Sequence, residues 1–487
     1  MTSPLPSKKL SLSWQNCSAI LPQDKAERDA WLIQLMSQQQ HQDYALWFDS
    51  TAAAHDNSRF HILLKQPDFY LQASDQGSEI KWLNPALEMP SLLAEFDPQT
   101  PFLTAAKQLH NKLQQQVEVA VHQDIPFNGG FAGYLSYDLG RQLEQLPQSN
   151  AVEYQTPTAG LGFYTTALVL DKQQQQLWLL APSKQHQSVL QSWLNPDNEA
   201  QPRSSAIPFK LTSTWRSNMQ RSEYQQRFAQ VREFLLAGDC YQINLAQRYS
   251  ASYEGSEWQA YLRIRQQNAA PFSAFMRLPQ GCLLSVSPER FLAVNSNQQV
   301  ETKPIKGTRP RFADPAADRN SREALKQSAK DQAENLMIVD LLRNDLSRSC
   351  LPDSIEVPHL FAIESFPAVH HLVSTIRGQL DPQKSVFELY QGAFPGGSIT
   401  GAPKVRAMQI IEQLEPNRRN IYCGSMVYFS LCGSSDSSIT IRTLLAEANQ
   451  LYCWAGGGLV IDSNESDEYQ ETLDKVARIL PILEQSS

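Results

Sequence analysis

Lys306 stands in the segment ETKPIKGTRPR, residues 301–311, between a proline and a glycine. Pro304 fixes one backbone dihedral angle, and Gly307 can adopt angles that other residues avoid. Threonines and arginines on both sides add hydrogen-bond donors and positive charge. The segment predicts a loop leaving a sheet edge that holds an amine toward an anion. The alternative is an exposed lysine, which is the commoner outcome for this residue type in a turn.

Two pairs of acidic residues are each separated by three positions. Asp331 and Glu334 fall in a long helical pattern at 321–346, and Glu468 and Glu471 fall in a helix that begins near residue 466. This spacing puts each pair on one helix face. Carboxylate oxygens without a histidine cluster suit Mg²⁺. The alternative is an exposed helix with an i, i+4 Glu/Lys pair.

The surrounding pattern predicts a mixture of sheet and helix. Two strands are expected in the segment GFYTTALVLDKQQQQLWLLAP, and a polar, proline-containing segment at 195–215 separates the first half from a helix that ends at Gly238. Residues 425–455 read as an antiparallel meander. We therefore expect the main boundary of the chain within 195–215.

Two glycine-rich segments resemble nucleotide-binding loops only superficially. In FPGGSITGAPK, Ala402 and Pro403 stand where a P-loop needs Lys and Ser or Thr, and the glycines at 456–458 do not fit GxGxxG. The first segment enters a helix, whose start favours an anion such as a carboxylate. The second is expected to be a loop, or a close approach of backbone to a ligand.

The composition excludes several partners. With a formal charge of −8 and no basic block, the chain lacks the features needed to bind nucleic acid or an acidic membrane. The seven cysteines form no CxxC pair, which indicates reduced thiols and a cytoplasmic protein. The sequence lacks a signal-peptide pattern and a long apolar run.

Several ordered motifs, including SPERF, ETKPIKGTRPR, KDQAENLMIVDLLRNDL, FPGGSITGAPKVRAM and AGGGLVIDS, resemble those of the chorismate-utilising enzymes. The resemblance is dense from about residue 235 to 480 and looser before it. It implies an α/β (α+β) fold in which antiparallel sheets pack as a sandwich with surrounding helices, as in anthranilate synthase. It also implies an N-terminal region of the anthranilate synthase component I type at 1–200 and a chorismate-binding catalytic domain at 216–482.

Two positions separate the reactions within this family. Members that form anthranilate or isochorismate usually have alanine in place of Lys306, and members that add water carry a lysine in place of Gln242. The residues present imply amination of chorismate at C4 to 4-amino-4-deoxychorismate, toward p-aminobenzoate and folate. The resemblance makes Lys306 the nucleophile that forms a covalent adduct and Glu289 the acid/base group, whose alternative role is a salt bridge to an arginine.

The resemblance also assigns the groups that hold the substrate and the metal. Arg442 and Tyr422 match the pair that holds the enolpyruvyl carboxylate, and Glu334 and Glu471 match ligands of Mg²⁺ that bridge to the ring carboxylate. Glu468 and Asp331 would stand behind them through water. The other implied substrate contacts are Ser398, His371, Lys475, Gln242 and the backbone amides of Gly456 and Gly458. His370 is expected to be structural.

The source of ammonia and a second pocket are also implied by the resemblance. No GxCxG nucleophile elbow surrounds any cysteine, so a separate glutamine amidotransferase subunit is expected to supply ammonia. Ser50 matches a serine of the pocket that binds tryptophan in some members, although the residues around it depart from that pattern. The alternatives to the amination are an anthranilate synthase large subunit and a non-catalytic, tryptophan-binding regulatory scaffold.

Overall fold

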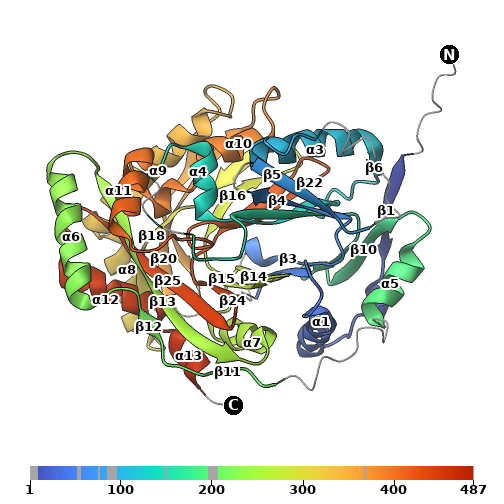
Figure 1. The fold of residues 1–487 in the computed structure, drawn as a ribbon, viewed down its shortest axis with the longest axis horizontal. Coiled ribbons are helices and arrows are strands. Elements are labelled where there is room, and N and C mark those ends of the chain that lie inside the picture. Colours follow the sequence, from blue (N-terminus) through green and yellow to red (C-terminus); the bar gives the residue numbers. More distant parts are fainter. Residues whose placement is uncertain are drawn as a thin grey trace.

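Two large, mostly antiparallel β-sheets pack against each other with helices around them, in a computed structural model (Figure 1). The structure describes residues 9–51, 56–74, 77–84, 96–147, 150, 152–195, 207–366 and 369–485. This architecture confirms the predicted fold class.

The first sheet has fourteen strands among the described residues. In spatial order they are β11 (Lys210–Leu211), β13 (Gln242–Glu254), β25 (Gln450–Leu459), β24 (Thr443–Glu447), β15 (Gly281–Ser287), β14 (Phe272–Leu278), β2 (Leu46–Asp49), β3 (Phe60–Leu64), β9 (Ala167–Asp171), β10 (Gln176–Pro182), β1 (Leu10–Asn16) and β6 (Val117–Val119). Two short strands, β12 (Arg216–Ser217) and β21 (Gly401–Ala402), pair with β13.

The second sheet has eleven strands within the same described ranges. Their order is β18 (Ile305–Pro310), β20 (Val369–Gln379), β17 (Gln299–Thr302), β16 (Arg290–Val294), β23 (Ser435–Ile439), β22 (Ser425–Ser430), β7 (Gly130–Leu135), β8 (Ala159–Tyr164), β4 (Phe69–Ser74) and β5 (Gly77–Trp82). Strand β19 (Glu356–Ser365) pairs with β20.

Both sheets combine strands from the two halves of the chain. In the first sheet β14 pairs with β2, and in the second β22 pairs with β7. The sequence predicts the boundary within 195–215, and residues 196–206 of that segment lie outside the described residues. The division into 1–200 and 216–482 therefore stays a prediction, and the two ranges share both sheets.

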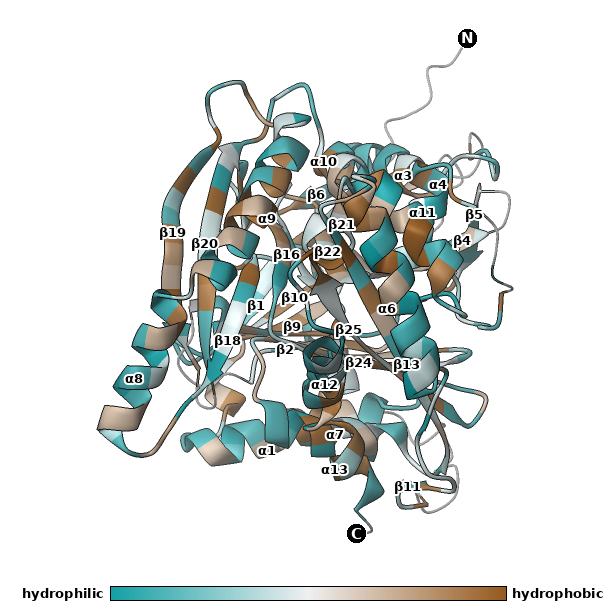
Figure 2. Ribbon diagram, turned by 90° about the vertical axis from the view of Figure 1, so that its left-hand side faces the viewer, coloured by the Kyte–Doolittle hydropathy of each residue, from teal (hydrophilic) through white to brown (hydrophobic). Residues whose placement is uncertain are grey.

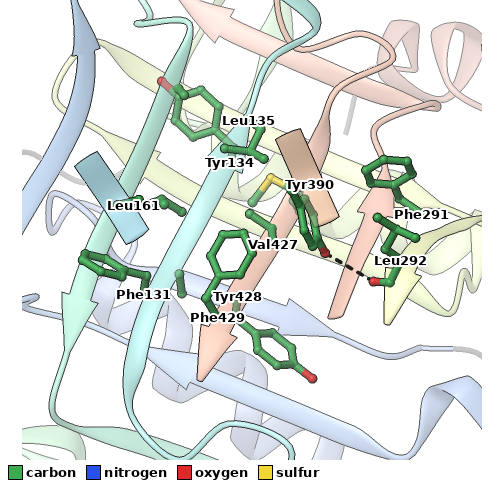
Figure 3. Packing of buried hydrophobic residues seen from close by; sticks show 14 of the residues in the cluster. Phe131, Tyr134, Leu135, Leu161, Phe291, Leu292, Tyr390, Val427, Tyr428 and Phe429 are labelled. Atoms are coloured by element: carbon green, nitrogen blue, oxygen red, sulfur yellow. Dashed lines mark hydrogen bonds between the residues drawn. The ribbon is translucent and has the colours of Figure 1, made fainter. Parts of the chain in front are cut away.

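The largest apolar core joins side chains of both sheets with those of the neighbouring helices. Phe131, Tyr134 and Val427 of the second sheet are fully buried within it (Figure 3). Leu283 and Leu445 of the first sheet are fully buried in the same core. These strands are long alternating or continuous apolar runs, which bury one or both faces. The core fixes the relative position of the two sheets, and the site described below depends on that position.

Helices cover the outer surfaces of the two sheets. They are α1 (Lys25–Gln39), α3 (Phe102–Gln116), α4 (Gly140–Leu143), α5 (His186–Leu194), α6 (Arg221–Leu236), α7 (Glu257–Asn268), α8 (Pro315–Lys326), α9 (Ala329–Ser347), α10 (Val386–Ala393), α11 (Lys404–Leu414), α12 (Glu465–Val476) and α13 (Leu480–Glu484), with the 3₁₀ turns η1 (Ser18–Ile20), η2 (Asp56–Ser58), η3 (Tyr137–Leu139) and η4 (Gly397–Ile399). Helix α8 lies at the outer edge of the molecule and is largely hydrophilic (Figure 2). Among the described residues, no helix combines the length and apolar character needed to span a membrane.

The predicted helix at 321–346 is two helices in the structure. Helix α8 ends at Lys326 and α9 begins at Ala329, because Ser328 caps the new helix by accepting a hydrogen bond from the backbone N–H of Asp331. Leu336 of α9 is exposed, whereas Ile338 and Leu342 are buried. The predicted C-terminal helix likewise ends at Val476 and resumes as α13.

The predicted C-terminal meander is divided between the two sheets. Strands β22 and β23 belong to the second sheet, and β24 and β25 belong to the first. The chain crosses between Ile439 and Thr443, where Arg442 has a φ of 51°. Elsewhere the strand predictions hold: β9 and β10 match the two strands expected in that segment.

All seven cysteines are free, and six of them are buried. This confirms the prediction that none forms a disulfide. Their burial agrees with the role of core residues.

Candidate active site

Lys306 lies in a strand with an irregular register, and the prediction of a loop is wrong. Ile305 of β18 pairs with Val373 of β20, and Thr308 pairs with His371, so three steps along β18 oppose two along β20. Such a bulge bends a strand and redirects a side chain. Strand β18 is at the end of its sheet, as the sequence predicts.

Gly307 is required beside this lysine for two reasons. Its φ is +83°, and a Cβ atom added to it would lie 2.8 Å from Cγ of Asp331. Any larger residue would therefore strain the backbone and push α9 away from β18. The glycine brings an acidic residue of α9 against the strand that carries Lys306.

The glycine-rich end of β25 is a strand and lies directly beside the lysine. Gly458 pairs with Asn244 of β13. A Cβ atom added to Gly458 would lie 3.3 Å from Nζ of Lys306 and 2.9 Å from Nε2 of Gln242. The prediction of a loop at 456–458 is wrong. The alternative role, in which the backbone at these glycines comes close to neighbouring groups, agrees with their packing.

Gln242 has a buried amide without a partner. The residue is fully buried, and neither its side-chain oxygen nor its nitrogen has a hydrogen-bond partner among the described residues. Leaving such a group unsatisfied is costly, because it loses its water without replacement. An amide in this state next to Lys306 is suited to bind a polar ligand.

The amine of Lys306 and the carboxyl of Glu289 have shifted pKa values in the same site. Burial lowers the pKa of Lys306, opposed by the negative charge of Glu334. Burial also raises the pKa of Glu289 from 4.5 to about 7, with Lys306 opposing the change. Burial thus favours the neutral form of both groups, and a neutral amine beside a protonated carboxyl is the combination needed for nucleophilic attack with acid assistance.

Ser398 and the first residue of β18 hold this carboxyl. The hydroxyl of Ser398 and the backbone N–H of Ile305 each lie 3.5 Å from Oε1 of Glu289. The backbone N–H of Glu289 is itself bonded to Ser287. Arg290 points elsewhere, to Asp436 and Glu301, so the salt bridge considered for Glu289 is not formed with its neighbour.

The four predicted metal-binding acids come from α9 and α12. A Cβ atom added to Gly457 would lie 2.8 Å from Oε2 of Glu468 and 3.7 Å from Oε1 of Glu471, which places α12 against the glycine-rich strand. Burial raises the pKa of Glu334, with a smaller contribution from the neighbouring carboxylates of Asp331 and Glu471. The two helices therefore bring their acids close enough to repel each other.

These acids fit a hard divalent cation such as Mg²⁺ in their chemistry. They supply only oxygen ligands, and their mutual repulsion would be relieved by a cation. Among the described residues, however, no three acidic, histidine or cysteine groups are close enough together to hold a metal ion. Two of the acids form ion pairs: Lys475 lies 2.6 Å from Glu471, and Arg309 lies 2.9 Å from Asp331.

Arg442 lies at the crossing between the sheets, and Tyr422 lies three residues before β22. Burial lowers the pKa of Arg442, and the charge of Arg478 adds to this, while Glu289 opposes it. Glu289 is thus close enough to Arg442 to affect its charge. Tyr422 is buried, with its ring parallel to that of Trp454 at 6.3 Å.

His371 and Lys475 are held by hydrogen bonds. Nδ1 of His371 lies 2.8 Å from the hydroxyl of Thr308, two residues beyond Lys306. Nζ of Lys475 donates to the carbonyl of Gly456 at 2.7 Å. His370 instead contacts Asp318 and Ser365, consistent with the structural role expected for it.

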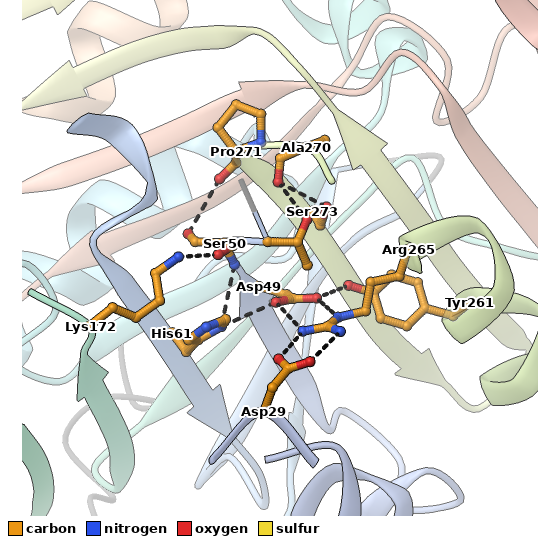
Figure 4. A network of polar contacts seen from close by, with 11 residues as sticks. Asp29, Asp49, Ser50, His61, Lys172, Tyr261, Arg265, Ala270, Pro271 and Ser273 are labelled. Atoms are coloured by element: carbon orange, nitrogen blue, oxygen red, sulfur yellow. Dashed lines mark hydrogen bonds and ion pairs between the residues drawn. The ribbon is translucent and has the colours of Figure 1, made fainter. Parts of the chain in front are cut away.

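Ser50 lies apart from these residues, beside a cavity of about 240 Å³ that includes Phe60, Phe272 and Ser438 in its lining. A buried polar network fixes it: Lys172 donates to the carbonyl of Ser50, and the preceding Asp49 binds Arg265 and His61 (Figure 4). The structure therefore brings together the predicted catalytic and metal-binding residues and separates Ser50 from them.

Two charged residues near the site escape the sequence prediction. Lys330 lies 3.9 Å from Glu334, and Arg419 is buried beside Tyr422. Lys330 and Glu334 form an i, i+4 pair, a spacing that could have identified it. Arg419 has partners as far as 175 positions away, and no local pattern marks it.

Comparison with known proteins places this site in one family. The family model described as chorismate binding enzyme matches residues 66–481. The chain is 48% identical over 449 residues to aminodeoxychorismate synthase component 1 of Salmonella typhimurium, covering 91% of this chain and 94% of that one. It is 47% identical over 446 residues to the protein of the same name from Escherichia coli, with the same coverage.

A solved structure has the same fold. Anthranilate synthase component I from Streptococcus pneumoniae superposes with a TM-score of 0.73 at 26% sequence identity, covering 88% of this chain and 93% of that one. The two sheets and their helices are therefore an arrangement shared with that protein.

Proposed function

The chain belongs to the chorismate binding enzymes, and we propose that it replaces the C4 hydroxyl of chorismate with an amino group, giving 4-amino-4-deoxychorismate on the way to p-aminobenzoate. The observation that carries this proposal is that one buried site contains both Lys306, an amine with a lowered pKa, and Glu289, a carboxyl with a pKa of about 7. The names of the bacterial relatives support the same reaction.

In the first step the neutral amine of Lys306 attacks C2 of chorismate. Both ring double bonds shift by one position, the C4–O bond breaks, and the oxygen leaves as water with the proton of Glu289. This proton makes a poor leaving group a good one. The products are a lysine adduct at C2, which carries a positive charge on nitrogen, and an ionised Glu289.

In the second step ammonia attacks C4 and both ring double bonds shift back. The C2–N bond breaks, and Lys306 leaves as the neutral amine. The new ammonium group at C4 then gives a proton to Glu289, which returns to its starting state. The two displacements together restore the original configuration at C4 and convert chorismate and ammonia into the amine and water.

The remaining residues hold the substrate. Arg442 and Tyr422 are suited to the enolpyruvyl carboxylate, because the planar guanidinium can bond both oxygens of a carboxylate. Ser398, His371, Lys475 and Gln242, with the amides of Gly456 and Gly458, would complete the contacts. These residues all belong to the proposed catalytic region, 216–482.

Glu334 and Glu471 would hold Mg²⁺, with Glu468 and Asp331 behind them. A bound Mg²⁺ would offset the charge of the ring carboxylate and fix its position. The ammonium group of Lys475 lies next to Glu471. The carboxylate of Glu471 would therefore contact positive charge from both Lys475 and the bound Mg²⁺.

A separate glutamine amidotransferase is the proposed source of ammonia. The name component 1, shared by the bacterial relatives, supports an enzyme of more than one component. The sequence carries no glutaminase nucleophile elbow of its own. With free ammonium in place of the partner, the chain should still aminate chorismate.

The product formed from chorismate, ammonium and Mg²⁺ tests the proposed function. We expect 4-amino-4-deoxychorismate as the main product, identified by chromatography and mass spectrometry. Anthranilate as the main product would favour the anthranilate synthase alternative, and Lys306 is the residue that argues against it. A chain that consumes no chorismate under any condition would favour the regulatory scaffold.

The cavity beside Ser50 is proposed to bind tryptophan. It combines aromatic walls with polar groups, and the buried hydroxyl of Ser438 has no hydrogen-bond partner among the described residues. Titration calorimetry with tryptophan tests this. Wild-type protein should bind, Ser50→Trp should not, and an absence of heat with the wild type would contradict the assignment.

A further inference from the structure

Arg419 is a buried cation whose guanidinium holds several elements of the site together. The residue is 2% exposed and follows helix α11. Nε donates to Glu415 at 2.9 Å, and Nη2 donates to the other oxygen of the same carboxylate at 2.6 Å. A bidentate pair of this kind neutralises the buried charge and fixes the plane of the guanidinium.

The remaining hydrogen bonds of Arg419 go to backbone carbonyls beside proposed substrate contacts. Nη1 donates to the carbonyl of Ile399, the residue after Ser398, at 3.1 Å. Nη2 donates to the carbonyl of Asn244 at 2.8 Å, and Asn244 lies two residues after Gln242, opposite Gly458. One side chain therefore ties the turn η4 to the start of β13.

Glu415 extends the same connection to the glycine-rich strand. Its Oε1 accepts the backbone N–H of Ala246 at 2.9 Å, and Ala246 pairs with Gly456 of β25. Loss of Arg419 would leave this carboxylate buried and uncompensated, which is strongly unfavourable.

The guanidinium also contacts the ring of Tyr422. Its central carbon lies 5.5 Å from the centre of that ring, within the range of a cation–π interaction. Tyr422 also stacks on Trp454, and the planes of the two rings differ by only 5°. Trp454 stands two residues before Gly456 in β25. Tyr422 is thus oriented by Arg419 and by the strand that carries the glycines.

We propose that Arg419 is a positioning residue for chorismate, acting through Tyr422, the turn at Ser398 and the start of β13. This inference rests on the proposed function. It predicts a defined kinetic signature: a shortened or reoriented cation should weaken the binding of chorismate while leaving the use of ammonia unaffected, because none of the contacts of Arg419 involves Lys306 or Glu289.

Arg419→Lys tests the proposal, because it keeps the charge but has all its donors on one nitrogen and cannot reproduce the planar, bidentate guanidinium. We expect the KM for chorismate to rise at least about tenfold, since small misplacements in a site have effects of this size or larger. The KM for ammonium should stay within about twofold of the wild type. Arg277→Lys is the matched control, since Arg277 also bonds a carboxylate, that of Glu257, and a backbone carbonyl, that of Gln40.

The outcomes separate the inference from the function on which it rests. If wild-type protein does not aminate chorismate, the proposed function fails. If it does, and Arg419→Lys has an unchanged KM for chorismate or matches Arg277→Lys, the positioning role is refuted. If Arg419→Lys does not fold, Glu415→Gln is judged by the same criterion, because it weakens the ion pair and keeps the shape.

Discussion

Replacing Glu289 with glutamine should make the protein less active and, at higher pH, more stable. Glu289 is 6% exposed, and burial raises the pKa of its carboxyl from 4.5 to about 7. Its stabilising contribution is fully present below pH 4.5 and is lost as the pH rises through 7, because the unfolded chain releases the proton more easily. The pKa of Glu289 is therefore about 2.5 higher in the folded protein than in the unfolded chain. At 1.36 kcal/mol per pKa unit, this difference corresponds to about 3 kcal/mol in the free energy of unfolding.

Urea unfolding of wild type and Glu289→Gln at pH 5, 6, 7 and 8 measures this difference. The free energy of unfolding of the wild type should fall relative to that of the variant by up to about 3 kcal/mol between pH 5 and 8. Glu233→Gln, at an exposed position on α6, should follow the wild type. Parallel curves for wild type and Glu289→Gln would refute the raised pKa.

The kinetics of the same variant test the role of the proton. Turnover should fall by at least about 10², the lower end for general acid–base catalysis. For the wild type, kcat/KM should decrease above about pH 7, as Glu289 loses its proton. Unchanged turnover in Glu289→Gln would remove the carboxyl from the mechanism even if the stability prediction held.

Other substitutions test the geometry of the site. Gly458→Ala would bring a methyl group within 3.3 Å of Nζ of Lys306, and should lower kcat by about 10² in assays with ammonium. Gly392→Ala is the control and should leave kcat unchanged, because the nearest atom to the added methyl group would be 3.6 Å away. Equal effects of the two substitutions would contradict the proposed packing. Glu334→Gln should weaken Mg²⁺ binding at least about tenfold by titration calorimetry. Equal affinities in wild type and variant would exclude Glu334 as a ligand.

Much of the fold follows from local patterns in the sequence. The strands β9 and β10 lie where their apolar runs predict them, and α6 ends at Leu236, two residues before Gly238, whose φ of +77° only glycine adopts easily. Interruptions within long patterns are harder to predict. Ser328 continues a helical sequence, yet its hydroxyl starts a new helix, because an N-cap competes with helix continuation.

The loops predicted at Lys306 and at 456–458 show a different limitation. Glycine and proline commonly mark turns, but here they occur in strands whose neighbours come too close for a side chain. Only the partner across the strand explains such a glycine, and that partner is distant in the sequence. The same holds for the crossing at Arg442, where the predicted meander is divided between the two sheets.

Intact-protein mass spectrometry of the chain incubated with chorismate and Mg²⁺, without ammonia, tests the central role of Lys306 most directly. Wild-type protein should gain the mass of chorismate less one water, peptide mapping should locate the addition at Lys306, and ammonium should remove it. Lys306→Ala should gain nothing. A wild type that never forms the adduct, or a Lys306→Ala variant that does, would contradict the covalent mechanism.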